Sequence, residues 1–202
     1  MLRKHFAASL LALVAAPFAT HAADAKPNFI VILTDDQGRA DYSAFGTPDI
    51  RTPGMDRIFR EGMTFENFYA NSCVCSPTRA ALLTGCFPDR VGVPGVIRHT
   101  PENSWGWLSP RAVLLPQILK PAGYHSAIVG KWHLGDQPEF LPTRHGFDQY
   151  FGLPYSNDMM KKAKANGQNV VPLVRGEKVT ELLTGDDQDH LTARYTDEAV
   201  KF

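Results

Sequence analysis

Short apolar runs of the kind that form buried strands recur along the chain. Residues 29–33, Phe-Ile-Val-Ile-Leu, form a continuous apolar run rich in β-branched side chains, which predicts a strand buried on both faces. Residues 126–129 predict a second buried strand, and residues 65–69 predict a short third one. Residues 170–174 and 178–182 lie on either side of an Arg-Gly pair, a pattern that predicts a hairpin.

Segments with helical spacing lie between these runs. Their caps, stops and apolar positions predict helices at residues 53–59, 76–84, 113–119 and 191–202. In the second of these we expect Ser76 to be the N-cap and Gly85 to end the helix. Residues 88–109, rich in Pro, Gly and Trp, predict a loop on the face that carries the strand ends. Strands alternating with helices predict an α/β fold with a largely parallel sheet flanked by helices.

The first residues have the pattern of a secretory signal. Arg3 and Lys4 precede an apolar stretch at residues 6–18, and small residues around Ala22 offer a cleavage site. The alternative is a membrane anchor, but the apolar stretch is short for a bilayer. We therefore expect residues 1–22 to be a cleaved signal peptide. The protein would then be exported, periplasmic or extracellular, without stable membrane insertion.

The overall charge excludes one class of partner. Lys and Arg together number 21 and so do Asp and Glu, which gives a formal net charge of zero. A protein held to nucleic acid by bulk positive charge would have a clear excess of basic residues. We therefore expect no nucleic acid partner.

Three cysteines, Cys73, Cys75 and Cys86, lie close together in the sequence. An odd number in an exported protein leaves at least one thiol unpaired. One possibility is a disulfide between two of the three, with the third as a buried thiol, and the sequence does not establish which two. Cys75 stands out because Arg79 follows it by one helical turn, and both would lie on one side of a helix start that favours anions. The alternative is a buried cysteine in an ordinary capped helix.

Two further pairs of side chains follow predicted strands. Asp35 and Asp36 come directly after residues 29–33 and would suit a hard cation, although a solvated acidic turn is the alternative. Lys131 and His133 follow the second strand, and in an extended segment they would point the same way. The alternative here is a surface lysine and a structural histidine. Ser156 lies in a predicted loop, and the residues around it do not by themselves indicate a function.

Taken together, these segments resemble the sulfatase family. Residues 75–85, Cys-Ser-Pro-Thr-Arg-Ala-Ala-Leu-Leu-Thr-Gly, are similar to its first signature, and residues 123–133 resemble its second. Residues 29–38 are similar to its N-terminal strand and acidic turn. Residues 145–148 and 152–156 resemble the stretch that follows in relatives of arylsulfatase A and N-acetylgalactosamine-6-sulfatase. The resemblance covers residues 27–202 and implies the N-terminal part of an alkaline phosphatase-like α/β fold.

The resemblance implies a reaction and a role for each matching residue. Cys75 would be converted by a formylglycine-generating enzyme or maturase to formylglycine, whose hydrate attacks the sulfur of a sulfate monoester. Asp35 and Asp36 would bind a divalent cation, usually Ca²⁺, together with an oxygen of the modified residue 75. Arg79 would hold the hydrate, and Lys131 would bridge the hydrate to the sulfate. His133 would help expel sulfate, and Ser156 would complete the inner shell of the site. The substrate would be a sulfated small molecule or glycan.

The family's site also uses residues farther downstream, namely a His, a second metal-ligand pair and another Lys. We find no match for them, so we expect residues 23–202 to be the N-terminal part of a sulfatase catalytic domain, incomplete at its C-terminus. The isolated chain is then expected to be inactive and poorly stable. Two other functions are weighed: a phosphomonoester or phosphonate hydrolase of the same superfamily, and a non-catalytic module that binds sulfated glycans.

Overall fold

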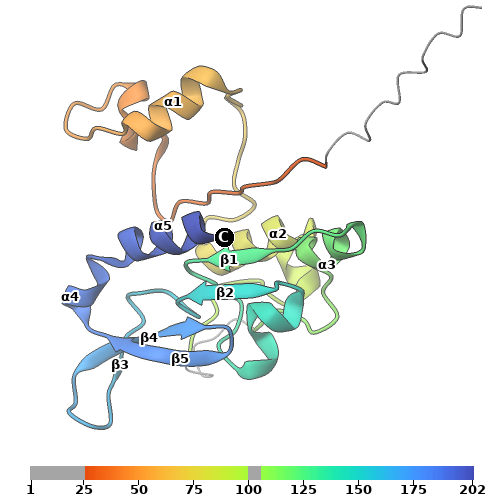
Figure 1. Ribbon diagram of the computed structural model, residues 1–202, viewed down its shortest axis with the longest axis vertical. Helices are drawn as coiled ribbons and strands as arrows, with labels where there is room; N and C mark the ends of the chain where they lie inside the picture. Colours follow the sequence, from red (N-terminus) through yellow and green to blue (C-terminus); the bar gives the residue numbers. More distant parts are fainter. Residues whose placement is uncertain (1–25, 100–105) are drawn as a thin grey trace, which may run out of the picture.

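The structure is a computed structural model, and it describes residues 26–99 and 106–202 (Figure 1). The predicted signal peptide, residues 1–22, lies outside the described residues, as does part of the predicted loop at 88–109. Within the described ranges, no helix is both long and apolar enough to cross a bilayer.

A sheet of five strands forms the centre of the described chain. Its strands are β1 Ala127–Val129, β2 Gln149–Gly152, β3 Lys161–Lys162, β4 Asn169–Arg175 and β5 Lys178–Leu183. β1 and β2 are parallel, whereas β4 is antiparallel to β2, β3 and β5. The predicted second strand and hairpin are confirmed, and β2 and β3 were not predicted. The expectation of a largely parallel sheet is wrong for this part of the chain, because β4 pairs antiparallel with β2, β3 and β5 and only β1 and β2 are parallel.

The helices of the described chain are placed differently: two pack on opposite faces of the sheet, and one stands away from it (Figure 1). They are α1 Pro53–Glu61, α2 Cys75–Thr84, α3 Leu115–Leu119, α4 Gly185–Gln188 and α5 Leu191–Lys201. Short 3₁₀ turns lie at Arg39–Asp41, Ser43–Phe45, Pro88–Val91, Lys120–Ala122, Pro138–Phe140 and Pro142–His145. The predicted helices at 53–59, 76–84 and 191–202 are confirmed to within a few residues. The one predicted at 113–119 is shorter, because its first two residues stay extended and only Leu115–Leu119 is helical.

Alternating side chains of the strands divide the core into two clusters. Tyr150 of β2 and Val174 of β4 pack with Ala80 of α2, Trp132 and the loop that carries Ile97. A second set of strand residues packs on the other face of the sheet against Leu191, at the start of α5. This set is Phe151 of β2, Val171 and Leu173 of β4, and Leu183 of β5. Successive residues of a strand face opposite sides of the sheet, so β2 and β4 each contribute to both clusters.

Two glycines let β2 and the turn after β1 touch. A Cβ on Gly152 would lie 1.8 Å from the carbonyl oxygen of Gly130 and 2.9 Å from its nitrogen. Gly130 has a φ of +111°, which side chains rarely allow. The amide of Gly130 donates to the carbonyl of Phe151 at 2.8 Å. The segments that leave β1 and β2 are therefore held backbone to backbone, and both continue into the site described below.

The predicted N-terminal strand is wrong for the described structure. Residues 29–33 form no strand and their side chains are 43–87 % exposed. The segment contacts residues before and after β1, since the hydroxyl of Tyr124 donates to the carbonyl of Pro27 at 2.9 Å and Asp35 reaches Lys131. Without a ladder of backbone hydrogen bonds to β1, it stays an extended segment. Residues 65–69 likewise form no strand, and Phe65, Phe68 and Tyr69 are exposed.

Residues 39–61 form a small unit that stands away from the sheet (Figure 1). The rings of Tyr42, Phe45 and Phe59 pack at centroid distances of 4.8–6.2 Å. Asp56 accepts hydrogen bonds from the hydroxyls of Ser43 and Thr52 at 2.6 and 2.8 Å. α1 buries no residue completely, so local contacts alone hold the unit together.

Candidate active site

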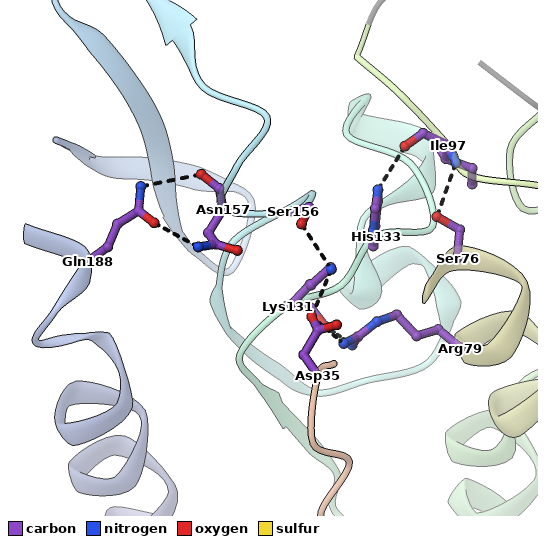
Figure 2. Close-up of polar contacts among 9 residues, drawn as sticks. All are labelled: Asp35, Ser76, Arg79, Ile97, Lys131, His133, Ser156, Asn157 and Gln188. Carbon is purple, nitrogen blue, oxygen red and sulfur yellow. Dashed lines mark hydrogen bonds and ion pairs between the residues drawn. The ribbon is translucent and has the colours of Figure 1, made fainter. Parts of the chain in front are cut away.

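Four predicted site residues meet where β1 and β2 end (Figure 2). Lys131 Nζ lies 2.7 Å from Asp35 Oδ2 and donates a hydrogen bond to Ser156 Oγ at 3.0 Å. Arg79 Nη2 lies 3.3 Å from the same carboxylate oxygen, and its Nη1 donates to the carbonyl of Lys131 at 2.6 Å. The side chains of Arg79 and Lys131 are each 12 % exposed. Two nearly buried cations therefore share one carboxylate.

The topology brings these residues together from four separate segments. Lys131 follows β1 and Ser156 follows β2, and because the two strands are parallel their carboxyl ends lie side by side. Asp35 comes from the extended N-terminal segment and Arg79 from the first turns of α2. The contact between Gly130 and Gly152 keeps the two strand ends close enough for Lys131 to reach Ser156.

The charged side chains of this group shift one another's pKa values. Partial burial would raise the pKa of Asp35, but the hydrogen bond from Lys131 and the positive charges of Lys131 and Arg79 outweigh it, so the pKa is lowered. Burial lowers the pKa of Arg79, and the nearby Asp35 and Cys75 oppose that shift. The carboxylate is thus held in its charged form, and the two cations together carry one more charge than it neutralises.

Cys75 is the first residue of α2, and its N-cap is Val74. The expectation that Ser76 caps this helix is wrong, because Ser76 is buried within the first turn and its hydroxyl faces Ile97 instead. Cys75 is half-buried and lies near the guanidinium of Arg79. Cys73, Cys75 and Cys86 are all free thiols, so the structure contains no disulfide between any two of them.

His133 is fully buried beside the charged group. Its Nε2 lies 2.8 Å from the carbonyl oxygen of Ile97, and its Nδ1 is buried with no hydrogen-bond partner in the described chain. Burial, and then the charge of Lys131, lower the pKa of His133 to about 4. The imidazole is therefore neutral at physiological pH.

The backbone at His133 departs from the extended path expected from sequence. Its φ is +61°, a left-handed conformation that costs a side-chain-bearing residue roughly 1–2 kcal/mol. The amides of Trp132 and His133 donate to the carbonyls of Leu153 and Pro154 at 2.9 and 3.1 Å, and Trp132 and Leu134 are buried. These hydrogen bonds and buried neighbours hold His133 in the left-handed conformation. Such imposed strain is common at functional sites.

The loop after β2 fixes Ser156 from the other side. Hydrogen bonding to Ser156 lowers the pKa of Asp158, so this carboxylate completes a chain of contacts through Ser156 to Lys131. Asn157 exchanges two hydrogen bonds with Gln188 of α4, at 2.9 and 3.3 Å (Figure 2). The loop is therefore tied to α4 while its serine contacts Lys131.

Asp36 does not join the group in the described structure. It is exposed, has a φ of +52°, and makes no described hydrogen bond or ion pair. Across residues 26–99 and 106–202, no three His, Cys, Asp or Glu side chains gather closely enough to hold a metal ion. Asp35 and Asp36 fit a hard cation by their chemistry, since carboxylate oxygens are its usual ligands, but two residues supply only part of its shell.

Comparison with known proteins decides the family. The sulfatase family model matches residues 27–202. The chain belongs to the sulfatase family. It is 40 % identical to N-acetylgalactosamine-6-sulfatase of the pig, Sus scrofa, over 96 % of this chain and 39 % of the relative. It is 44 % identical to arylsulfatase A of cattle, Bos taurus, over 68 % of this chain and 27 % of the relative. The chain thus spans about two fifths or less of the length of these relatives.

Solved structures show the same fold. The crystal structure of Ps i-CgsB matches 88 % of this sulfatase chain with a TM-score of 0.69 and 32 % identity, over 42 % of its own length. A protein solved in complex with its substrate, D-glucosamine-2-N,6-O-disulfate, matches 88 % of the chain with a TM-score of 0.65 and 29 % identity, over 31 % of its own length. The fold is therefore a sulfatase-like mixed α/β arrangement.

Three contributors to the site were not predicted from sequence. Ser76 was assigned as a cap, although its place between Cys75 and Pro77 was a signal that it lies in the site. Asp158 follows Ser156 by two residues in a polar loop, which was a weak signal. No sequence feature indicates the carbonyl of Ile97, because every residue has a backbone carbonyl. Only the fold places this one within hydrogen-bond distance of His133.

Proposed function

We propose that this sulfatase hydrolyses sulfate monoesters of sulfated carbohydrates, with residue 75 as the nucleophile after conversion to formylglycine. The observation that carries the proposal is the pair of nearly buried cations, Arg79 and Lys131, beside the half-buried Cys75 at the start of α2. The relatives named above support the choice of sulfate and of sugar. We further propose that the protein is exported, to the periplasm or the extracellular space, and modified by a formylglycine-generating enzyme or maturase.

The net reaction adds water to a sulfate ester and releases an alcohol and hydrogen sulfate. The hydrated aldehyde would supply two hydroxyl groups. One would attack sulfur as the ester S–O bond breaks, its proton passing to the departing alcohol; deprotonation of the other would expel sulfate and restore the aldehyde, which water then hydrates again. A plain thiol has no second hydroxyl for that release. This difference is the chemical reason for modifying Cys75.

The chain's own residues would bind the anion and move the proton. Lys131 and Arg79 would offset the charge of the sulfate and of the leaving oxygen, and because their side chains are each 12 % exposed, this electrostatic stabilisation would be weakly screened by solvent. Ser156 holds the ammonium of Lys131 in place. His133 is neutral, so it would take up a proton at Nδ1 when sulfate leaves.

A divalent cation, Ca²⁺ in our proposal, would be held in part by Asp35, Asp36 and the oxygen of the modified residue 75. It would supply further positive charge for the sulfate oxygens. Binding would require Asp36 to turn toward Asp35, whose carboxylate now contacts Lys131 and Arg79.

The test has a chemical and a catalytic part. Mass spectrometry of the Cys75 peptide, from protein exported by a host with the modifying enzyme, should show loss of sulfur and gain of an aldehyde. The Cys75→Ala variant should lack the aldehyde, and Cys73→Ala should keep it. An unmodified Cys75 would instead favour a module that only binds sulfated glycans.

For the catalytic part, the longest reading frame that contains this sequence is assayed with an aryl sulfate and the matching aryl phosphate. We expect turnover of the sulfate ester and loss of at least about 10³-fold in Cys75→Ala, since removal of a covalent nucleophile has effects of this order. Preferential turnover of the phosphate ester would overturn the assignment in favour of a phosphomonoester hydrolase.

A further inference from the structure

Ser76 contacts the loop that holds His133. Its side chain is fully buried, and its Oγ accepts a hydrogen bond from the backbone N–H of Ile97 at 3.1 Å. The carbonyl of the same Ile97 lies 2.8 Å from Nε2 of His133 (Figure 2). One residue of the loop therefore joins the first turn of α2 to the imidazole through its own N–H and C=O.

This contact determines where the histidine carries its proton. A backbone carbonyl can only accept a hydrogen bond, so Nε2 must be the donor and must carry a hydrogen. In the neutral ring the other nitrogen, Nδ1, is then unprotonated, and it is buried without a partner in the described residues. Nδ1 is thus the atom of His133 that is free to accept a proton.

We infer that Ser76 is a positioning residue, which fixes the carbonyl of Ile97 so that His133 keeps its hydrogen on Nε2 and presents Nδ1 as the proton acceptor. The side chain of Ile97 lies in the core with Ala80 of α2, so both of its polar groups start from a rigid position. The partner that orients a histidine commonly sets its tautomer. Here that partner is a backbone carbonyl, and Ser76 holds it in place.

The consequence is a direct link between the nucleophile and the proposed base. Ser76 is the covalent neighbour of Cys75, so a shift of α2 that moves the nucleophile also moves the hydroxyl that holds Ile97. Arg79, one turn further along α2, contacts the carbonyl of Lys131. α2 therefore contacts Lys131 directly, through Arg79, and His133 indirectly, through Ile97. The use of Nδ1 in catalysis rests on the proposed function, whereas the tautomer and its support do not.

The tautomer is measured by NMR of the ¹⁵N-histidine-labelled chain, with His133→Asn to assign the signals. We expect a protonated Nε2 and an unprotonated Nδ1 in the unmodified protein, with slow exchange of the Ile97 amide hydrogen. Ser76→Ala should speed exchange of the Nε2 hydrogen by roughly fivefold, about the effect of losing one hydrogen bond. Ser76→Thr keeps the hydroxyl and should restore slow exchange.

A hydrogen on Nδ1 of His133, or a rapidly exchanging Ile97 amide in the unmodified chain, would overturn the inference without Ser76→Ala having to fold. Unchanged Nε2 exchange in a folded Ser76→Ala protein would do the same. In the catalytically active protein, with rates normalised to formylglycine content, Ser76→Ala should lower kcat several-fold at unchanged KM. If no sulfate ester is turned over at all, the proposed function fails while the NMR result still decides the tautomer.

Discussion

At the scale of single residues, His133 has an unusual combination of features. It is fully buried beside Lys131, it has a left-handed backbone, and one of its ring nitrogens has no partner in the described chain. Burial next to a cation disfavours the charged imidazolium, which is why its pKa falls to about 4. The imidazole is therefore neutral, with one unprotonated ring nitrogen, and it is a weaker base than an exposed histidine.

We predict that His133 makes stability depend on pH. An unfolded histidine takes up its proton as the pH falls through about 6.5, whereas the folded one stays neutral until a pKa of about 4. Between these values the unfolded chain binds more protons, so acid favours unfolding. The free energy of unfolding should fall by about 2 kcal/mol between pH 7 and pH 5 because of this residue. Urea unfolding at both values measures the fall.

Two variants isolate that effect. His133→Asn should lose this part of the pH dependence, whereas the exposed His190→Asn should keep it. Burial also lowers the pKa values of His99 and His145, but these residues are present in all three proteins. Equal losses of stability in the unmodified chain and in His133→Asn would contradict the prediction.

At the scale of elements, the contact between β2 and the turn after β1 sets the spacing of the site. Gly152 and Gly130 touch through their backbones, and the next residues on each side include Leu153 and Trp132, which are hydrogen-bonded to each other. Lys131 and Ser156 follow from this arrangement. The spacing of the site therefore depends on the absence of a side chain at Gly152 and on the positive φ of Gly130.

Gly152→Ala should destabilise the chain by roughly 3 kcal/mol, because its methyl group would overlap the carbonyl of Gly130 and neither backbone can move freely. Thermal or urea unfolding gives the magnitude. The matched control is Gly54→Ala in α1, where a Cβ meets nothing within 4 Å and alanine favours the helix. A Gly152→Ala protein as stable as the Gly54→Ala protein would show that the two segments separate easily.

Local sequence signals predicted some elements well and others poorly. The helices at α1, α2 and α5 and the hairpin of β4 and β5 were predictable because helical spacing of apolar positions, glycine stops and a tight turn specify them within a few residues. Residues 29–33 have the strongest strand pattern in the chain, yet they form none. A strand needs a partner for its backbone, and apolar composition alone does not supply one.

At the scale of the whole molecule, the described chain exposes a large apolar surface. The side chains at residues 29–33 are 43–87 % exposed, and Phe65, Phe68 and Tyr69 are exposed by 69–81 %. Soluble proteins rarely expose so many consecutive large apolar side chains. This surface should govern the behaviour of the chain in solution.

We predict that the 202-residue chain self-associates through residues 29–33. Ile30 is 87 % exposed, and burying such a side chain is worth about 1.5–3 kcal/mol. Ile30→Lys should therefore weaken association at least about tenfold, as measured by sedimentation over a range of concentrations. Thr64→Lys adds the same charge at another exposed position and should leave association unchanged. Equal association of both variants would exclude this surface.

The sequence by itself determined the family and the types of side chain available for chemistry, because short motifs around Cys75, Lys131 and Asp35 carry that information in consecutive residues. Only the tertiary structure decided which of them meet. It placed one carboxylate, Asp35, between two cations and left Asp36 exposed. It also placed the carbonyl oxygen of Ile97 within hydrogen-bond distance of Nε2 of His133. Those contacts join segments 25 to 96 residues apart, and their geometry follows from how strands and helices pack, which no local pattern encodes.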